Sequence, residues 1–525
     1  MNQLTKQALI FAFVLALLGA GVFAVGQVIS NDSSNGAVGT TPAPVNSETV
    51  GTDTVTTETA STSSTSTTST TTTTTAPAAL VDPNSFGQPW GTTVQGVLTF
   101  RGNPTRSYYG TGPIPQTKPQ VLWRYPGKKM CGSSSEYGNV RTWCGTGWTG
   151  QPAVFERDGR TWLVFGAYDY KIHFVDAATG QDIIPPFPTK DLAKGNVTVD
   201  PDGFPLIYEG SRDNHFRVIA FDGAAPRELY SIDAHTPDRV HNDDWDAAAL
   251  IVNDYLVEGS ENSWFYGLKL NRGYATDGTV TVDPQEAFRV QGWDTQLFHD
   301  LGSKDPRRVS LEASVSISGD TAWLNNSGGL VQGWDLSSLR TGVGTVTRTF
   351  RFWTGDDSDS TIVPDAEGFL YVGVEVDRAT KRNEEVGQML KLDPRKPDNP
   401  IVWSVHLPFR VDDGVWSTPI IAGDVVLWTS KPGWIYGIDK NTGEVLWKQK
   451  INGPALSSPA LVDGVLIQGD GAGILHAYDL SNPRAAPVEL WSLALGGNIE
   501  STPVVWKGRI YVGTRAGFEV AVGIP

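Results

Sequence analysis

Cysteine is nearly absent from the sequence, with only Cys131 and Cys144 among 525 residues. The two form no CxxC motif, which excludes thiol redox exchange and a zinc knuckle, and no CxxCH motif for haem attachment occurs. A close, even pair of cysteines is typical of a structural disulfide in an oxidising compartment. The intervening segment, CGSSSEYGNVRTWC, is rich in Gly and Ser. We therefore predict a disulfide that pins a surface loop outside the cytoplasm.

Basic residues are also scarce: 41 Lys and Arg stand against 57 Asp and Glu, which gives a formal net charge of -16. Binding to nucleic acid requires clustered Lys and Arg, so we expect no nucleic-acid partner. The acidity favours solubility, and it is also suited to cations or basic surfaces. The motifs of serine hydrolases, P-loop nucleotide-binding proteins and Rossmann folds are missing.

One long apolar run is present, from Ala8 to Ile29, and it contains no charged residue. Its length is sufficient for a helix that crosses a membrane. Lys6 precedes the run and the next basic residue is Arg101, which places the N-terminus in the cytoplasm and the rest outside. A signal peptide cleaved after Ala24 is the alternative. We expect residues 1–30 to form a retained, single-pass membrane anchor.

Residues 31–83 show no apolar periodicity, and residues 61–75 are all Ser or Thr. Such a tract buries too little apolar surface to offset its ordering entropy. We expect a disordered linker with a reach of about 40 Å, followed by one folded domain over residues 84–525.

Internal repeats organise that domain. The clearest copies begin at Trp416, Ser457 and Ser501, and each predicts four short strands separated by Gly-containing turns. Weaker copies precede them, at residues 151–187, 196–230, 245–290, 311–353 and 359–403. Eight such units gain stability only by stacking, and closure into a ring protects their edges. The sequence therefore predicts an all-β, eight-bladed propeller.

The last copy predicts how the ring closes. It ends at Pro525 without the Trp-bearing fourth strand of the other copies, while an orphan strand of that kind, PQVLWRY, lies at Pro119 to Tyr125. We predict that Val121 to Tyr125 is the outer strand of the eighth blade. A seven-bladed ring or an open stack of β units is the alternative.

The turn between the third and fourth strands carries a family resemblance. The segments DKNTGEVLW at Asp439 to Trp447 and DAATG at Asp176 to Gly180 resemble the repeat of pyrroloquinoline quinone (PQQ) type propellers. This family includes quinoprotein dehydrogenases and the outer-membrane assembly propeller BamB. The opening FRGNPTRSYYGTGP from Phe100 also resembles the lead-in segment of such proteins. In these repeats the Trp packs between blades, which implies docking roles for Trp123, Trp403, Trp447 and Trp491.

The resemblance also implies a cofactor site. Quinoprotein dehydrogenases bind PQQ above a calcium ion, with a vicinal Cys-Cys disulfide, a stacking Trp and a Glu, Asn and Asp set. Here Cys131 and Cys144 are 13 positions apart, and no Glu with a matching motif is present. We therefore expect no PQQ, whereas calcium stays a candidate cation.

Alignment of the first strands predicts a ring of carboxylates. Trp416 aligns with Asp246, Glu312 and Glu500, and approximately with Asp359, so these residues are predicted to share one face near the channel. Oxygen-rich clusters suit hard cations such as calcium. The alternative is that these are turn-forming and surface groups. Further carboxylates accompany them: Asp243, Asp244, Asp356, Asp357, Asp412 and Asp413.

One histidine, His241 in RVHNDDWD, lies among acids near the same predicted face. It is a candidate acid, base or metal ligand, with a structural role as the alternative. The other histidines show no HExxH spacing.

These features favour a membrane-tethered, extracytoplasmic binding or scaffold module without enzymatic activity. We expect a monomer that binds a protein or cell-envelope ligand through propeller loops, with residues 271–286 and 377–386 as candidate surfaces. The alternative is a divergent PQQ- and calcium-dependent dehydrogenase, or another cation-dependent enzyme that uses the central channel.

Overall fold

The computed structural model describes residues 78–136, 138–148, 150–194, 196–303 and 307–525. The chain divides into two units, and the second, Thr75–Pro525, contains all of these residues. The predicted anchor, and the predicted linker up to residue 77, lie outside the described residues. In the described part of the chain, no helix has the length and apolar character needed to span a bilayer.

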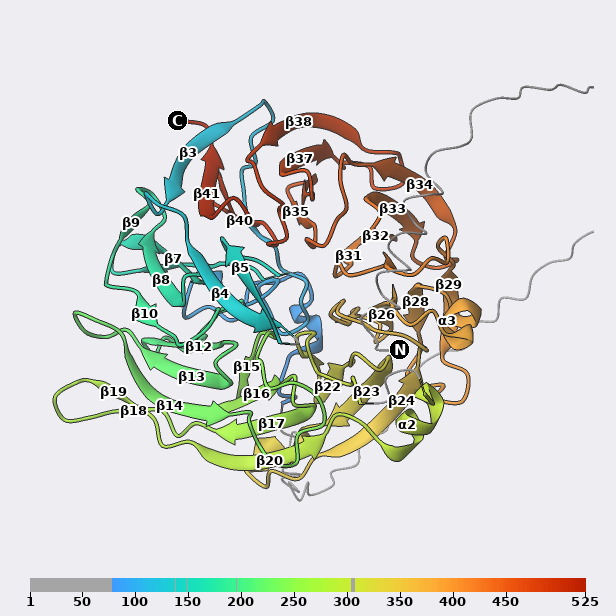
Figure 1. Cartoon of the computed structure of the whole chain (residues 1–525), viewed down its shortest axis with the longest axis horizontal. Coiled ribbons are helices and arrows are strands. Elements are labelled where there is room, and N and C mark those ends of the chain that lie inside the picture. Colours follow the sequence, from blue (N-terminus) through green and yellow to red (C-terminus); the bar gives the residue numbers. More distant parts are fainter. Residues whose placement is uncertain (1–77, 137, 149, 195, 304–306) are drawn as a thin grey trace, which may run out of the picture. The chain divides into compact units, whose positions relative to one another are not determined.

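Eight antiparallel sheets form a ring in the Thr75–Pro525 unit (Figure 1), which confirms the eight-bladed propeller. Each blade is a meander that runs from the channel outward, and in blade 1 the short strand β1 (Gly96–Val97) pairs with β6 on its channel side. Blade 1 has β6 (Ala153–Arg157), β7 (Arg160–Ala167), β8 (Lys171–Asp176), β9 (Gln181–Asp182) and β10 (Phe187–Pro188). Blade 2 has β11 (Thr198–Val199), β12 (Leu206–Gly210), β13 (His215–Ala220) and β14 (Arg227–Asp233). Blade 3 has β15 (Leu250–Val252), β16 (Tyr255–Gly259), β17 (Trp264–Lys269) and β20 (Gln285–Gln291). Blade 4 has β21 (Ser316–Ser318), β22 (Thr321–Leu324), β23 (Leu330–Asp335) and β24 (Thr347–Trp353).

The second half of the ring follows the same order. Blade 5 has β25 (Val363–Pro364), β26 (Leu370–Gly373), β28 (Met389–Leu392) and β29 (Ile401–Val405). Blade 6 has β31 (Ile420–Ala422), β32 (Val425–Ser430), β33 (Trp434–Asp439) and β34 (Val445–Lys450). Blade 7 has β35 (Ala460–Val462), β36 (Val465–Gly469), β37 (Ile474–Asp479) and β38 (Val488–Ala494). Blade 8 begins with β39 (Val504–Trp506), β40 (Arg509–Thr514) and β41 (Phe518–Gly523).

Short elements lie outside the blades. The helices are η1 (Pro83–Ser85), α2 (Thr295–Leu301), η2 (Ser337–Thr341) and α3 (Lys381–Val386). Two-stranded pairs are β4 (Cys131–Glu136) with β5 (Asn139–Cys144), β18 (Gly273–Tyr274) with β19 (Val280–Thr281), and β27 (Glu375–Val376) with β30 (Asp413–Gly414). Leu80 and Val81 fall within the predicted linker but contact blade 4: their amides donate to Asp320 Oδ1 and the Gly319 carbonyl.

The apolar core lies between the blades rather than within any one of them. Strand β12 shows why: Leu206 and Tyr208 pack against blade 3, whereas Ile207 between them packs against blade 1. Side chains alternate along a strand, so a strand covered on both faces must be apolar at every position. Apolar clusters of this kind lie between neighbouring blades all around the described ring.

N-terminal strands complete the last blade, as predicted. Strand β3 (Gln120–Tyr125) pairs antiparallel with β41 as its outer strand, and Trp123 lies opposite Ala521. Strand β2 (Gly110–Thr111) pairs parallel with β39 on the channel side. The chain therefore closes its ring with strands from both ends of the domain.

Tryptophans of the outer strands contact the next blade through a repeated geometry. Trp123 Nε1 donates to the Ala177 carbonyl at 3.1 Å, and its ring lies against Gly180. Gly180 has a φ of +68°, and a Cβ there would lie 2.7 Å from the indole, so both the turn and the contact require glycine. Trp403, Trp447 and Trp491 donate to the carbonyls of Lys440, Pro483 and Pro115.

Replacing Trp123 with alanine should open this closing contact. The loss of a large, partly buried ring and its hydrogen bond is expected to lower the free energy of unfolding by about 3 kcal/mol. Urea unfolding measures the change, with the exposed neighbour Arg124→Ala as the control. A decrease below about 1 kcal/mol would show that Trp123 does not hold the ring closed.

The lead-in segment from Leu98 to Tyr109 plugs the central channel, which the sequence did not indicate. Two fully buried arginines fix it. Arg101 donates to the carbonyls of Pro419 and Pro459 in blades 6 and 7. Arg106 donates to the carbonyls of Ala248 and Val315 in blades 3 and 4. Each guanidinium thus bridges the carbonyls of two neighbouring blades, and together the two arginines link the plug to four blades of the ring.

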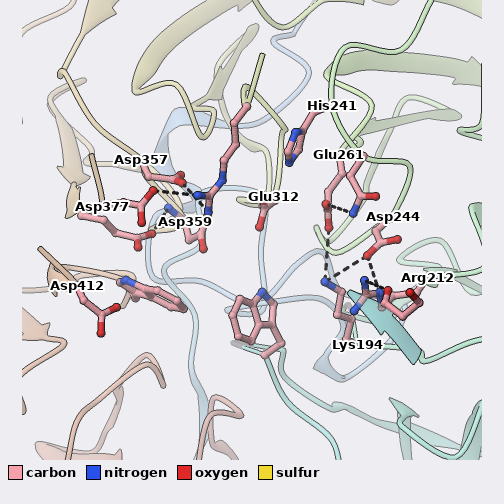
Figure 2. Close-up of a pocket in the computed structure, with 16 residues that line it drawn as sticks. Lys194, Arg212, His241, Asp244, Glu261, Glu312, Asp357, Asp359, Asp377 and Asp412 are labelled. Atoms are coloured by element: carbon pink, nitrogen blue, oxygen red, sulfur yellow. Dashed lines mark hydrogen bonds and ion pairs between the residues drawn. The ribbon is translucent and has the colours of Figure 1, made fainter. Parts of the chain in front are cut away.

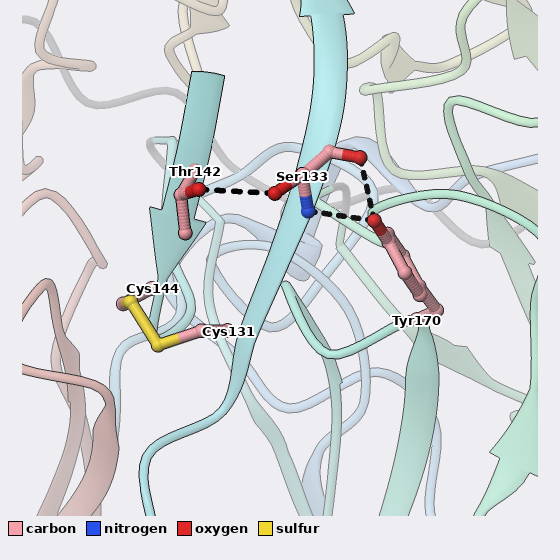
Figure 3. The surroundings of a disulfide bond; sticks show 5 residues. All are labelled: Cys131, Ser133, Thr142, Cys144 and Tyr170. Atoms are coloured by element: carbon pink, nitrogen blue, oxygen red, sulfur yellow. Dashed lines mark hydrogen bonds between the residues drawn. A yellow bond between two sulfur atoms is a disulfide. The ribbon is translucent and has the colours of Figure 1, made fainter. Parts of the chain in front are cut away.

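The two cysteines form a disulfide in the β4–β5 hairpin (Figure 3). The predicted surface loop is thus a regular two-stranded ladder in which Cys131 and Cys144 are directly paired. Ser133 exchanges hydrogen bonds with the Tyr170 hydroxyl, which attaches the hairpin to blade 1. A structural disulfide is typical of proteins outside the cytoplasm.

Candidate functional site

A pocket of about 510 Å³ opens at the channel end where the inner strands begin (Figure 2). The lining includes residues that precede the first strands, such as Asp244, Glu312 and Trp416, and residues in the turns after the second strands, such as Arg212 and Glu261. The lining residues are Ser135, Trp148, Lys194, Arg212, His241, Asn242, Asp244, Glu261, Arg308, Glu312, Asp357, Asp359, Glu375, Asp377, Asp412 and Trp416.

On one wall, a lysine contacts a group of three buried carboxylates, and burial nevertheless raises the pKa of Asp244 to about 7 and the pKa of Glu261 well above its usual value. Lys194 Nζ lies 2.6 Å from Asp246 and 3.5 Å from both Asp244 and Glu261. Arg212 adds a contact of 2.8 Å to Asp244. Burial alone would lower the pKa of Lys194, but the three carboxylates raise it well above its usual value. The carboxylates of this wall are therefore paired with a cation of the protein itself, Lys194.

The opposite wall is poorly compensated. Oxygens of Asp357, Asp359 and Glu375 lie within 4.8 Å of one another. Two arginines contact Asp357, and both are shared: Arg308 lies 3.5 Å from Asp357 and 2.9 Å from Asp377, and Arg378 lies 3.9 Å from Asp357 and 3.5 Å from Asp356. Burial raises the pKa of Asp357 to about 7, and burial and mutual repulsion raise the pKa values of Asp359 and Glu375 well above the usual range. We call these three carboxylates the acidic triad.

Two tryptophans flank the pocket. The rings of Trp148 and Trp416 meet edge to face, with centroids 5.4 Å apart. Lys194 lies 5.6 Å from the Trp148 centroid, and Lys431 lies 4.3 Å from that of Trp416. Both rings thus present π-surface to cations within the usual range of cation–π contacts.

The structure places the four predicted cation ligands differently. Glu312 and Asp359 line the pocket, and Asp246 lies behind its wall, paired with Lys194. Glu500 is not among the described lining residues and lies 3.8 Å from Arg515. Of the accompanying carboxylates, Asp244, Asp357 and Asp412 line the pocket, while Asp243 binds His235 and Asp356 accepts amide bonds from residues 378 and 379.

Sequence reasoning missed Lys194, Arg212, Glu261, Arg308 and Glu375. A signal for three of them exists in the repeats. Arg212, Glu261 and Glu375 each stand two residues after a glycine, at positions 210, 259 and 373, that ends the second strand of a blade. In each of these blades the turn after the second strand therefore lies at the pocket, beside the start of the first strand.

Three carboxyl groups without hydrogen-bond partners in the described part of the chain are also buried in strands β12, β16 and β41. Both side-chain oxygens of Glu209, Glu258 and Glu519 accept no hydrogen bond within the described structure, and all three side chains are inaccessible to solvent. Burial raises each pKa well above its usual value, because an ionised carboxylate there would lose its hydration without compensation. Burial therefore favours the protonated form of these groups in the folded protein, most simply for Glu519, whose pKa is shifted by burial alone.

Stability is expected to fall as pH rises because of these protons. The folded protein keeps a proton on Glu519 that the unfolded chain releases above a pKa of about 4.3, so unfolding becomes easier by up to about 1.4 kcal/mol per pH unit. Glu519→Gln removes this pH dependence. We therefore expect the free energy of unfolding of the variant, relative to that of the parent, to increase between about pH 5 and pH 8. Thermal unfolding measures this difference in stability, and Glu489→Gln, at an exposed position, is the control. Parallel pH profiles for parent and Glu519→Gln would contradict the assignment.

Comparison with known proteins gives partial matches. The family model described as outer membrane protein assembly factor BamB matches residues 387–517. The quinoprotein alcohol dehydrogenase PedE of Pseudomonas putida is 30% identical over 93 residues, 17% of this chain and 14% of that protein. The lanthanide-dependent methanol dehydrogenase of Methylacidiphilum fumariolicum is 25% identical over 229 residues, 41% of this chain and 35% of that protein. The matches thus span well under two thirds of either relative.

Solved structures are similar at low identity. BamB from Moraxella catarrhalis is 15% identical with a TM-score of 0.48, over 71% of this chain and 93% of that one. The computationally designed Ika8 protein is 12% identical with a TM-score of 0.48, over 72% and 99%. The chain is thus an eight-bladed β-propeller that is similar to PQQ/BamB-type repeat proteins over residues 387–517 and distantly similar to quinoprotein dehydrogenases.

Proposed function

We propose that this protein is an extracytoplasmic binding propeller, tethered by its N-terminal segment, that captures a positively charged group of a protein partner in its pocket. The observation that carries the proposal is the charge of the lining: eight carboxylates face three permanent cations, Lys194, Arg212 and Arg308. A cleft lined with one sign of charge concentrates ligands of the other sign.

The acidic triad is the part of the pocket that best fits such a group. Lys194 and Arg212 are committed to the opposite wall, and Arg308 is shared between Asp357 and Asp377. The raised pKa values of the triad reflect like charges held together under burial. An incoming ammonium or guanidinium group would relieve that repulsion, so binding is favoured by electrostatics that already exist in the free protein.

The predicted partner loops differ in their relation to the pocket. The segment 377–386 contributes Asp377 to the lining and continues into α3. The segment 271–286 carries the β18–β19 hairpin, at the periphery of the ring in Figure 1. The first loop supports the proposal as a contact surface beside the pocket, and the second stays a candidate for a separate contact.

A labelled oligolysine peptide tests the proposal. We expect saturable binding that weakens with salt, no binding of a matched oligoglutamate, and at least about a tenfold loss of affinity in Asp357→Asn/Glu375→Gln. Because both carboxylates already have raised pKa values, their neutralisation should not harm the fold. Exposed Glu489→Gln is the charge-matched control. Equal binding by the double variant would contradict the proposal.

A divergent quinoprotein dehydrogenase is the second candidate, favoured by the paired Trp148 and Trp416 rings and by the partial matches to PedE and the lanthanide-dependent enzyme. The residues fit the cofactor poorly. PQQ carries several carboxylates, whereas the pocket is strongly acidic and its cations are held by internal carboxylates. The disulfide lies in the β4–β5 hairpin and is not vicinal. Near-ultraviolet and visible absorption after addition of PQQ and calcium distinguishes the two: uptake of the chromophore would favour the dehydrogenase.

A further inference from the structure

Three side chains from two blades converge at one side of the pocket, apart from the acidic triad. His241 lies between β14 and β15, Glu261 in the turn between β16 and β17, and Glu312 before β21. One ligand atom of each lies within 4.8 Å of the others. In Figure 2 the three side chains surround the same part of the pocket.

Neighbouring polar groups orient the two carboxylates. Ser310 and Ser327 donate to Glu312 Oε1 at 2.5 and 3.1 Å, and Asn242 Nδ2 donates to Glu261 Oε2 at 2.7 Å. Each carboxylate is thus held by hydrogen bonds to one of its two oxygens. Hydrogen bonds of this type position the ligands in metal sites.

The second oxygen of Glu261, Oε1, is buried but has no hydrogen-bond donor among the described residues. Glu261 is only 4% exposed. Lys194 Nζ lies 3.5 Å from Oε1, but the same lysine lies closer to Asp246, at 2.6 Å. A buried carboxylate oxygen in this state is stabilised by a cation at the cluster.

We propose that His241, Glu261 and Glu312 bind a divalent transition-metal ion, with Zn²⁺ as the best fit. One imidazole nitrogen and two carboxylate oxygens suit Zn²⁺ better than Ca²⁺, which takes oxygen ligands. Tetrahedral bonds of about 2.0–2.2 Å place ligand atoms about 3.3–3.6 Å apart, so side-chain rotations that draw the three ligand atoms together complete the site. Three protein ligands leave further coordination positions open to the pocket. This site is separate from the acidic triad and does not depend on the peptide-binding proposal.

Calorimetric titration of the chelator-treated full chain with Zn²⁺, and separately with Ca²⁺, tests the site. We expect one Zn²⁺ per chain, bound more tightly than Ca²⁺, and at least about a hundredfold loss of Zn²⁺ affinity in His241→Ala and in Glu312→Gln. His235→Ala is the matched control, because His235 is paired with Asp243 and is not part of the cluster. It should bind Zn²⁺ like the parent.

Co²⁺ provides a readout that does not depend on stability. The parent and His235→Ala should give a visible Co²⁺ absorption band that His241→Ala lacks, while thermal unfolding shows that all three proteins are folded. Unchanged Zn²⁺ affinity in His241→Ala, or tighter binding of Ca²⁺ than of Zn²⁺, would overturn the inference. Oligolysine binding is measured in the same variants, so failure of the metal site is distinguishable from failure of the proposed function.

Discussion

Replacing Arg106 with methionine is expected to lower the free energy of unfolding by about 4 kcal/mol. The guanidinium is fully buried and donates to the carbonyls of Phe100, Ala248 and Val315 and to the Thr99 hydroxyl. Methionine fills much of the volume but donates nothing, so these acceptors lose their partner inside the channel. Two blades and the plug would be affected together.

Urea unfolding of Arg106→Met measures this effect, and exposed Arg124→Ala serves as the control. Arg106→Lys should fall between parent and methionine, because an ammonium keeps the charge but cannot span acceptors on two blades. If Arg106→Met unfolds within about 1 kcal/mol of the parent, the plug does not tie the ring together.

Lys194→Met is expected to have the second large effect, a loss of about 3–5 kcal/mol at neutral pH. The substitution leaves Asp244, Asp246 and Glu261 close together, with Arg212 as the remaining partner in direct contact. The repulsion raises the carboxylate pKa values in the folded variant, so it keeps protons that the unfolded chain releases. Stability of the variant therefore falls as pH rises above about 4, and its deficit is smaller near pH 5 than near pH 8.

Thermal unfolding of Lys194→Met across this pH range measures the deficit. Added Ca²⁺ should restore part of the stability, because three oxygen ligands then lack their cation and binding to the folded state stabilises it. Lys381→Met, which is highly exposed, is the control. A deficit that does not change with pH would show that packing, rather than charge, is what Lys194 contributes.

The fold could be predicted because its signals are local and repeated. Gly180 and Gly443 mark the turns on which Trp123 and Trp403 of the preceding blades pack, and the missing fourth strand after Ser501 pointed to β3. The plug had no such signal. Arg101 and Arg106 donate to backbone carbonyls of residues more than a hundred positions away. Because every residue has a backbone carbonyl, the sequence does not indicate which carbonyls accept these hydrogen bonds.

The candidate site was predictable only in part, for a related reason. Aligning first strands located the face and brought Glu312 and Asp359 to it, but it ignored the turns after the second strands that supply Glu261 and Glu375. The alignment also gave no information on which carboxylates are paired with a lysine or an arginine. Glu500 shares the alignment but lies near Arg515, and Asp246 shares it but is bound by Lys194 from the neighbouring blade. Which carboxylates stay available depends on cations that the alignment does not show.

A crystal structure of the protein with bound oligolysine peptide tests the central claim most directly. The predicted result is a lysine ammonium within about 4 Å of Asp357, Asp359 and Glu375, the distance of an ion pair, with the peptide leaving the pocket beside residues 377–386. Peptide bound elsewhere, such as in the groove between the outer strands of blades 5 and 6 around Trp434, with the pocket unchanged, would contradict it.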